Sequence, residues 1–147
     1  MPAVSIGKNF ELDLYGFQGA AQNKDFAGKA FQLMGRLWKL VRERGLKNKG
    51  QNVWVYEAQD LVFAGVELSG DHFDAAGMEH KLISLDKYGY YKHIGPYNLI
   101  KQAGEKMTYE LKNQGYETSL PYIEVYGHWT EDQTKLETEL YIRVISR

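Results

Sequence analysis

The chain has 147 residues, of which 44% are hydrophobic and 25% are charged, and its formal net charge is -1. This length and composition fit a globular protein of one domain or of two small fused halves. The net charge close to zero gives no support to binding of nucleic acid or of an anionic membrane. The absence of cysteine excludes disulfides, thiolate catalysis and thiolate metal sites, and it is compatible with a reducing compartment.

The N-terminal segment "MPAVSIGKNFELDLYG" lacks the apolar region of a signal peptide. No apolar run reaches the length of about 18 residues that a membrane-spanning helix needs. We therefore expect a cytoplasmic protein that contacts no membrane.

In the first half, "FELDLYGFQGA" alternates in the manner of a strand that begins at Phe10. The segment "KDFAGKAFQLMGRLWKLVRERG" has apolar residues at helical spacing and predicts a helix. Asp25 is the expected N-terminal cap, Gly45 the expected stop, and Trp38 a core residue of the helix. "QNVWVYEA" and "LVFAGVEL" predict two strands.

The second half repeats this order. "HKLISLDKYGYYKHIG" predicts a strand region, "PYNLIKQAGEKMTYELKNQG" a helix that stops at Gly115, and "PYIEVYGHW" and "ETELYIRVI" two further strands. Residues 69–80 are polar and read as a linker. The sequence thus predicts an α+β fold of duplicated β-α-β-β units, within a single domain made of repeats at about 1–70 and 80–147.

The repeats align at an offset of 70 residues, which places Trp54 on Glu124 and Tyr56 on Tyr126. We expect a pseudo-twofold pair of units with antiparallel sheet, helices and a central ligand cleft. If the flanking valine and isoleucine residues pack on the helices, then Trp54 and Glu124 face away from the helices, toward the cleft.

Glu124 is the first candidate site residue, because a carboxylate in the middle of a buried strand is costly without a partner. It either meets a cationic ligand or pairs structurally with Lys92, Arg143 or a tyrosine hydroxyl. Tyrosine is also unusually frequent, with 11 residues, nine of them between Tyr88 and Tyr141. This cluster is typical of an amphipathic binding surface, although strand propensity explains it as well.

The motifs "YYKHIGPYNLI", "LKNQGYE", "YIEVYG" and "TELYIRVI", in this order, resemble the GyrI-like or bacterial transcription activator effector-binding domain family. The resemblance covers nearly the whole chain. It implies a ligand site between duplicated units, in which Glu124 lies among aromatic residues and faces lipophilic cations. No DNA-binding domain precedes the repeats, so the expected protein is a stand-alone module, similar to members on mobile gene cassettes.

The expected function is capture of lipophilic cationic drugs or dyes, without catalysis, a cofactor or direct contact with nucleic acid. A partner protein or a homodimer is compatible with this role. The alternative that the resemblance implies is a hydrolase of cyclopropane-containing DNA-alkylating natural products, in which Glu124 activates water. A third reading is a protein–protein regulator such as a topoisomerase inhibitor, but no acidic patch supports it.

Six aromatic residues accompany Glu124 as candidate ligand contacts, and each is also open to a packing role. Five are expected walls of the cleft and Trp129 is an expected gate or edge cover; the walls are Trp54, Tyr56, Tyr91, Tyr126 and Tyr141. The linker holds His72, Asp74, Glu79 and His80, whose spacing matches no established metal motif, so no metal is expected. His93 is expected to make a structural hydrogen bond.

Overall fold

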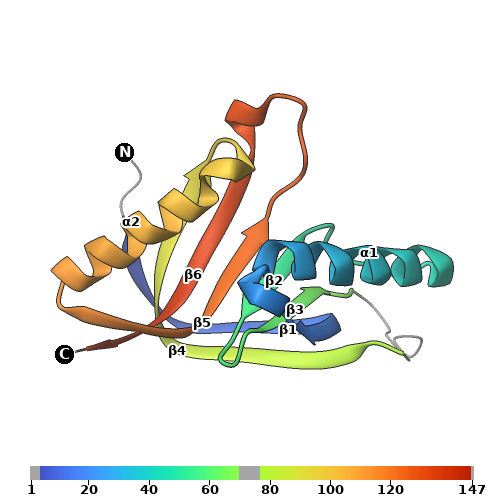
Figure 1. Cartoon of the computed structure of the whole chain (residues 1–147), viewed down its shortest axis with the longest axis horizontal. Helices are drawn as coiled ribbons and strands as arrows, with labels where there is room; N and C mark the ends of the chain where they lie inside the picture. Colours follow the sequence, from blue (N-terminus) through green and yellow to red (C-terminus); the bar gives the residue numbers. More distant parts are fainter. Residues whose placement is uncertain (1–3, 70–76, 147) are drawn as a thin grey trace. The chain divides into compact units, whose positions relative to one another are not determined.

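The computed structural model describes residues 4–69 and 77–146 (Figure 1). In chain order the elements are β1 (Ser5–Ala20), η1 (Gln22–Lys24), α1 (Phe26–Arg44), β2 (Asn52–Tyr56), β3 (Leu61–Val66), β4 (Glu79–Ile94), η2 (Tyr97–Leu99), α2 (Ile100–Asn113), β5 (Tyr116–Tyr126), η3 (Gln133–Lys135) and β6 (Glu137–Ser146). This order confirms the α+β class. In the described part of the chain, no helix is long and apolar enough to cross a membrane.

The chain forms two compact units, and their boundaries differ from those of the predicted repeats. Unit 1 comprises Met1–Phe10 and Ser84–Arg147, and unit 2 comprises Glu11–Ile83. The two long strands β1 and β4, with 16 residues each, contribute residues to both units. The first strand therefore begins before Phe10, where the sequence predicts its start. His72 and Asp74 of the predicted linker lie outside the described residues.

Unit 2 contains an antiparallel sheet in the order β1-β3-β2 together with α1. Both predicted ends of the helix are confirmed. The Asp25 carboxylate accepts a hydrogen bond of 3.1 Å from the Gly28 N–H, and Gly45 ends the helix with a φ of 59°, in the left-handed region that favours glycine. Trp38 is only half-buried, and its indole N–H donates to the Asn52 side chain. Trp38 thus lies at the margin of the core.

The face of β2 that α1 covers is the reverse of the sequence-based expectation. The Trp54 ring contacts the Phe31 ring of α1 edge-on at 5.3 Å, and Tyr56 contacts Phe26 at 6.0 Å. Trp54 and Tyr56 therefore face the helix. Val53 and Val55 point to the other side of the strand, where they are also fully buried.

Unit 1 contains an antiparallel sheet in the order β5-β6-β4 together with α2. The register aligns Glu124 with Leu140 and Leu140 with Tyr91, so these three side chains lie on one face of the sheet. The adjacent rung aligns Ile123, Tyr141 and Tyr90, whose side chains lie on the opposite face. The assignment of every site residue of unit 1 to a face follows from these two rungs.

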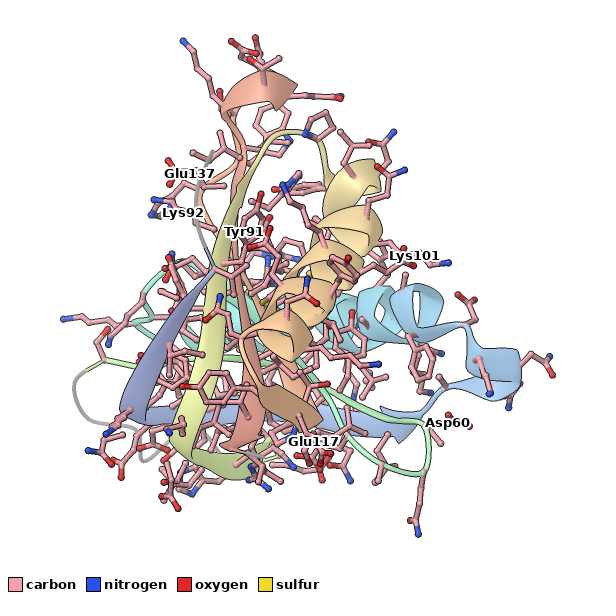
Figure 2. The ribbon with its side chains drawn as sticks, turned by 90° about the vertical axis from the view of Figure 1, so that its left-hand side faces the viewer. Asp60, Tyr91, Lys92, Lys101, Glu117 and Glu137 are labelled. Carbon is pink, nitrogen blue, oxygen red and sulfur yellow. The ribbon has the colours of Figure 1, made fainter. Side chains whose placement is uncertain are left out.

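Helix α2 packs on the face that carries Glu124. The core cluster there combines buried residues of α2 with residues of β4 and β6 and with Val4, and Tyr122 and Tyr126 of β5 pack against it. Its buried members are Val4, Tyr91, Ile100, Ala103, Met107, Leu111, Leu140, Ile142 and Val144. In Figure 2, Tyr91 lies on the α2 side of β4, whereas Lys92 and Glu137 lie on the other side. The prediction that Glu124 faces away from the second helix is therefore wrong.

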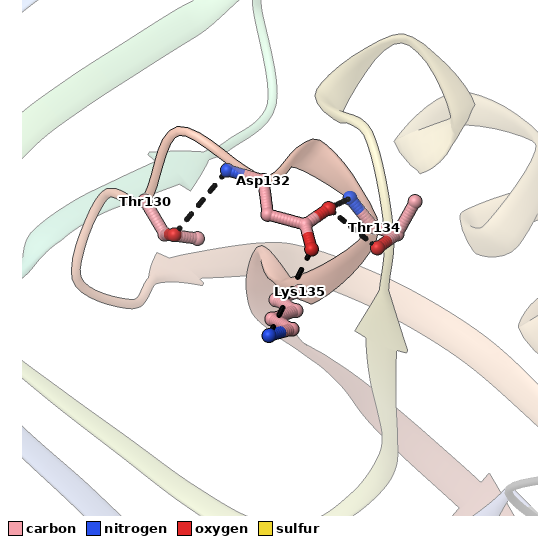
Figure 3. Close-up of polar contacts among 4 residues, drawn as sticks. All are labelled: Thr130, Asp132, Thr134 and Lys135. Atoms are coloured by element: carbon pink, nitrogen blue, oxygen red, sulfur yellow. Dashed lines mark hydrogen bonds and ion pairs between the residues drawn. The ribbon is translucent and has the colours of Figure 1, made fainter.

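A polar turn orders the connection between β5 and β6 (Figure 3). The Asp132 carboxylate accepts hydrogen bonds from the Thr134 N–H at 3.0 Å and the Thr134 hydroxyl at 2.6 Å, which caps η3. Lys135 approaches the same carboxylate at 3.8 Å. This cap fixes the direction in which the chain enters β6, the central strand of the unit 1 sheet.

Candidate functional site

The candidate site is centred on the Glu124 carboxylate in the middle of β5. Glu124 is only 7% exposed. The Tyr122 hydroxyl donates to its Oε2 at 2.8 Å, and the Tyr126 hydroxyl donates to its Oε1 at 2.6 Å. Both carboxylate oxygens thus accept a tyrosine hydroxyl. The alternation of the strand produces this arrangement, because residues at positions i−2, i and i+2 share one face.

Two tyrosine hydroxyls are contacts of Glu124, as one of the sequence-based alternatives expects. Lys92, a partner suggested by the sequence, forms an ion pair with Glu137 instead (Figure 2). Lys92 lies on the face opposite to Glu124, because it aligns with Glu139 and Val125 in the sheet. Arg143, the other basic partner suggested by the sequence, is exposed and lies near the C-terminal end of β6. The tyrosine hydroxyls donate hydrogen bonds to both oxygens of the carboxylate.

Helix α2 approaches the site with a glycine. A Cβ placed on Gly104 would lie 3.3 Å from the Tyr122 hydroxyl oxygen, closer than most such contacts. Gly104 thus gives the tyrosine that holds Glu124 the space it occupies under the helix. Its neighbours in the helix, Ala103 and Met107, are buried in the core beside the site.

An aromatic contact links the site to the surface of the unit. The Tyr126 ring meets the Tyr97 ring of η2 edge-on at 5.5 Å, and Tyr97 is 39% exposed. Burial of its ring raises the pKa of Tyr97, so its hydroxyl remains protonated at neutral pH. Tyr97 belongs to the "HIGPY" motif, yet its role is missed from the sequence, because a residue before a helix carries no periodic signal.

Tyr91 is buried on the same face as Glu124, one strand beyond Leu140. His93 follows on that face and is also buried. Its Nε2 lies 3.0 Å from the Pro96 carbonyl oxygen, which confirms the predicted structural hydrogen bond. Tyr91 thus belongs to the core on the face of Glu124, and its role as a wall of the ligand site stays a prediction.

The other predicted aromatic residues do not gather around Glu124 within unit 1. Tyr141 lies on the opposite face of the sheet, beside Glu139. Trp54 and Tyr56 belong to unit 2, where they contact α1. Trp129 follows the end of β5 and is 71% exposed. Their roles as ligand contacts stay predictions.

Among residues 4–69 and 77–146, no group of three or more histidine, aspartate or glutamate side chains could hold a metal ion. Cysteine is absent from the whole chain. The surroundings of Glu124 combine a buried carboxylate with tyrosine rings and an aliphatic core.

The chain repeats the order β-α-β-β in an α+β fold, and one repeat holds a buried carboxylate under its helix. Residues 22–145 match the model of the GyrI-like small molecule binding domain. The chain belongs to this family. No curated protein sequence matches the chain significantly.

Solved structures with the same fold include the C-terminal domain of EcmrR, at a TM-score of 0.78, 15% identity and coverage of 100% of this chain and 99% of that one. SAV2435, bound to tetraphenylphosphonium, superposes with a TM-score of 0.66 at 18% identity, covering 99% and 94% of the two chains. A hydrolase from Listeria innocua has a TM-score of 0.60 at 9% identity, covering 97% and 91%. Identities this low establish the shared fold alone.

Proposed function

We propose that this protein captures lipophilic cations and that Glu124 is the charge partner of the bound ligand. The observation that carries the proposal is a carboxylate only 7% exposed whose two oxygens accept hydroxyls of Tyr122 and Tyr126. Desolvation of a carboxylate costs several kcal/mol, of which hydrogen bonds to neutral groups offset only part. A cationic ligand adds the Coulomb attraction that neutral hydroxyls do not supply.

The magnitudes favour a cation that is also apolar. Two unit charges about 4 Å apart attract by roughly 4 kcal/mol at the effective dielectric of a protein surface. Each tyrosine face adds about 0.5–2 kcal/mol through cation–π contact. Apolar surface buried under α2 contributes about 25 cal/mol per Å². The likeness in fold to SAV2435, whose structure holds tetraphenylphosphonium, supports a ligand of this class.

The test is a titration with tetraphenylphosphonium, followed by calorimetry, on the wild type and on Glu124→Gln. The amide keeps the size of the side chain and removes its charge. We expect the variant to bind about 10- to 100-fold more weakly, since a lost charge–charge contact of 1.4–2.8 kcal/mol corresponds to that range. Glu117→Gln, which removes an exposed carboxylate from the same strand, is the matched control and binds as the wild type does.

Triphenylphosphine oxide supplies a neutral ligand of similar aromatic surface. We expect it to bind the wild type and Glu124→Gln with the same affinity, because it offers no charge to the carboxylate. Equal binding of tetraphenylphosphonium by the wild type and Glu124→Gln would remove Glu124 from recognition. Equal binding of both ligands by the wild type would show that the charge of the ligand plays no part in recognition.

Hydrolysis is the second candidate function, because a Listeria innocua protein of the same fold is described as a hydrolase. In this reading the Glu124 carboxylate accepts a proton from water that attacks a strained, electrophilic ring of the bound molecule. The substrate class is a cyclopropane-containing alkylator of DNA. Turnover of such a compound by the purified protein, lost in Glu124→Gln, would establish this activity, and binding without turnover would exclude it.

A further inference from the structure

A second carboxylate–tyrosine cluster lies on the face of the unit 1 sheet opposite to Glu124. Its carboxylate belongs to Glu139 of β6. The Tyr90 hydroxyl donates to Glu139 Oε2 at 2.6 Å, and the Tyr141 hydroxyl approaches the same oxygen at 3.4 Å. Glu139 and Tyr90 are half-buried, so the cluster is accessible to solvent at its edge. From the sequence, Tyr141 is a candidate site residue and strand alternation puts Glu139 on its face, but no role is predicted for Glu139.

The two tyrosines at this carboxylate belong to a group of four aromatic rings. Phe10 stacks on Tyr141 at 4.3 Å with an interplanar angle of 11°, and Tyr90 lies 5.1 Å from Tyr141. Tyr88 completes the group at 5.2 Å from Phe10 and 5.6 Å from Tyr141. The rings pack on one another, and those of Phe10, Tyr88 and Tyr90 are partly exposed. Their outer faces and edges, together with the carboxylate, suit a compact cation.

Two bases, Lys92 and Arg143, share the face of the sheet that carries Glu139. Lys92 is the neighbouring base on this face, and its ammonium group pairs with Glu137. The hydrogen bond and the charge of Glu137 raise the pKa of Lys92, so this lysine stays protonated and paired with Glu137. Within residues 4–69 and 77–146, Glu139 has no ion pair. Arg143 is exposed and lies four residues beyond Glu139 along β6, so neither of the two bases forms an ion pair with Glu139.

The two tyrosines act as hydroxyl donors that hold the carboxylate. Burial raises the pKa of Tyr90, and its hydrogen bond to Glu139 and the charge of Glu139 raise it further. Burial and the Glu139 charge likewise raise the pKa of Tyr141. Both hydroxyls therefore remain protonated well above neutral pH and donate to Oε2. Oε1 keeps its lone pairs for another donor or a cation.

We propose that the cluster of Glu139, Tyr90, Tyr141, Phe10 and Tyr88 is a second site, which binds a compact alkylammonium group. The site is separate from Glu124, because the strand alternation places the two carboxylates on opposite faces of β5 and β6. Glu139 supplies the charge, and the tyrosine rings supply cation–π contact. The proposal stands independently of the function assigned to Glu124.

Tetramethylammonium is the probe, and its methyl protons are followed by NMR, since aromatic rings shift the signal of a cation that lies over them. We expect binding by the wild type and a loss of affinity of at least about tenfold in Glu139→Gln, which removes the charge and keeps an acceptor for both hydroxyls. Glu117→Gln is the control. The uncharged probe tert-butanol should not bind measurably.

The ring protons of Tyr90 and Tyr141 provide a second measurement on the wild type itself. Assigned through Tyr90→Phe and Tyr141→Phe, they should shift during the titration, whereas those of the exposed Tyr109 should not. Equal affinity of tetramethylammonium for wild type and Glu139→Gln, or a titration that leaves these rings unmoved, would overturn the proposal.

A cross-comparison separates the two sites. Glu139→Gln should keep its affinity for tetraphenylphosphonium, and Glu124→Gln should keep its affinity for tetramethylammonium. Loss of both probes in Glu139→Gln would contradict separate sites. Failure of tetraphenylphosphonium to bind the wild type would refute the function proposed for Glu124 and leave tetramethylammonium binding as the test of Glu139.

Discussion

Position 54 in unit 2 and position 124 in unit 1 occupy the same place in their repeats, and they hold opposite kinds of side chain. The helices align at the same offset of 70 residues, which carries the buried positions of α1 onto those of α2. The two sets are Ala30, Leu33, Leu37 and Val41 in α1, and Ile100, Ala103, Met107 and Leu111 in α2. Each repeat thus places one strand residue under its helix: Trp54 in one and Glu124 in the other.

The residues around Trp54 and Glu124 differ in polarity, as the two side chains themselves do. Trp54 is 5% exposed and meets the Phe31 ring, while Glu124 is 7% exposed and meets tyrosine hydroxyls. The offset also places Met34 of α1 on Gly104 of α2. Unit 2 fills the space under its helix with bulky apolar groups, and unit 1 combines a glycine with a carboxylate. A repeated backbone therefore provides one position that packs a ring against its helix and one that we propose for recognition.

The largest effect is expected from Trp54→Ala. Removal of a buried indole should lower the free energy of unfolding by about 3–5 kcal/mol, because the lost contacts leave a cavity under α1. Urea denaturation followed by circular dichroism measures this loss. Trp129→Ala, at an exposed position, should change stability by less than about 0.5 kcal/mol. Similar losses in the two variants would contradict a packing role for Trp54.

Tyr126→Phe tests the other side of the comparison. The variant loses the hydroxyl that donates to Glu124 at 2.6 Å, and a hydrogen bond to a charged group is worth about 1.5–3 kcal/mol. We expect a stability loss in this range and weaker binding of tetraphenylphosphonium, since the carboxylate loses its fixed orientation. Tyr109→Phe, at a surface position, is the control for both measurements. An unchanged unfolding curve for Tyr126→Phe would show that its hydroxyl does not hold the carboxylate.

Gly104→Ala and Gly35→Ala form a matched pair with the smallest expected effect. Alanine in place of glycine inside a helix stabilises it by about 0.5–1 kcal/mol. Gly35 has open space around it, so its variant should show this gain in full. At Gly104 the new methyl group crowds the Tyr122 hydroxyl, so the gain should be smaller and tetraphenylphosphonium should bind more weakly. Thermal melts and titrations of both variants make the comparison, and identical results would remove Gly104 from the site.

The ends of α1 and the doubled order of elements are determined locally, and the sequence predicts them. Asp25 caps the helix and Gly45 ends it because their side chains and conformations act on the adjacent backbone. The register of the repeats follows from apolar spacing alone, and it brings Trp54 and Glu124 to equivalent positions. The motifs of the second half also indicate the GyrI-like family, which the family model confirms.

The tertiary structure alone decides which face of each strand the helix covers. Alternation separates Val53 and Val55 from Trp54, but all three are buried, so no exposed side marks the face away from the helix. The same ambiguity in β5 leads to the wrong face for Glu124. Glu139 is missed for a related reason, because Tyr90 lies 49 positions away and only the pairing of β4 with β6 brings its hydroxyl to that carboxylate. Local spacing fixes a residue's neighbours along the chain, whereas its partners across a sheet depend on how the strands pair.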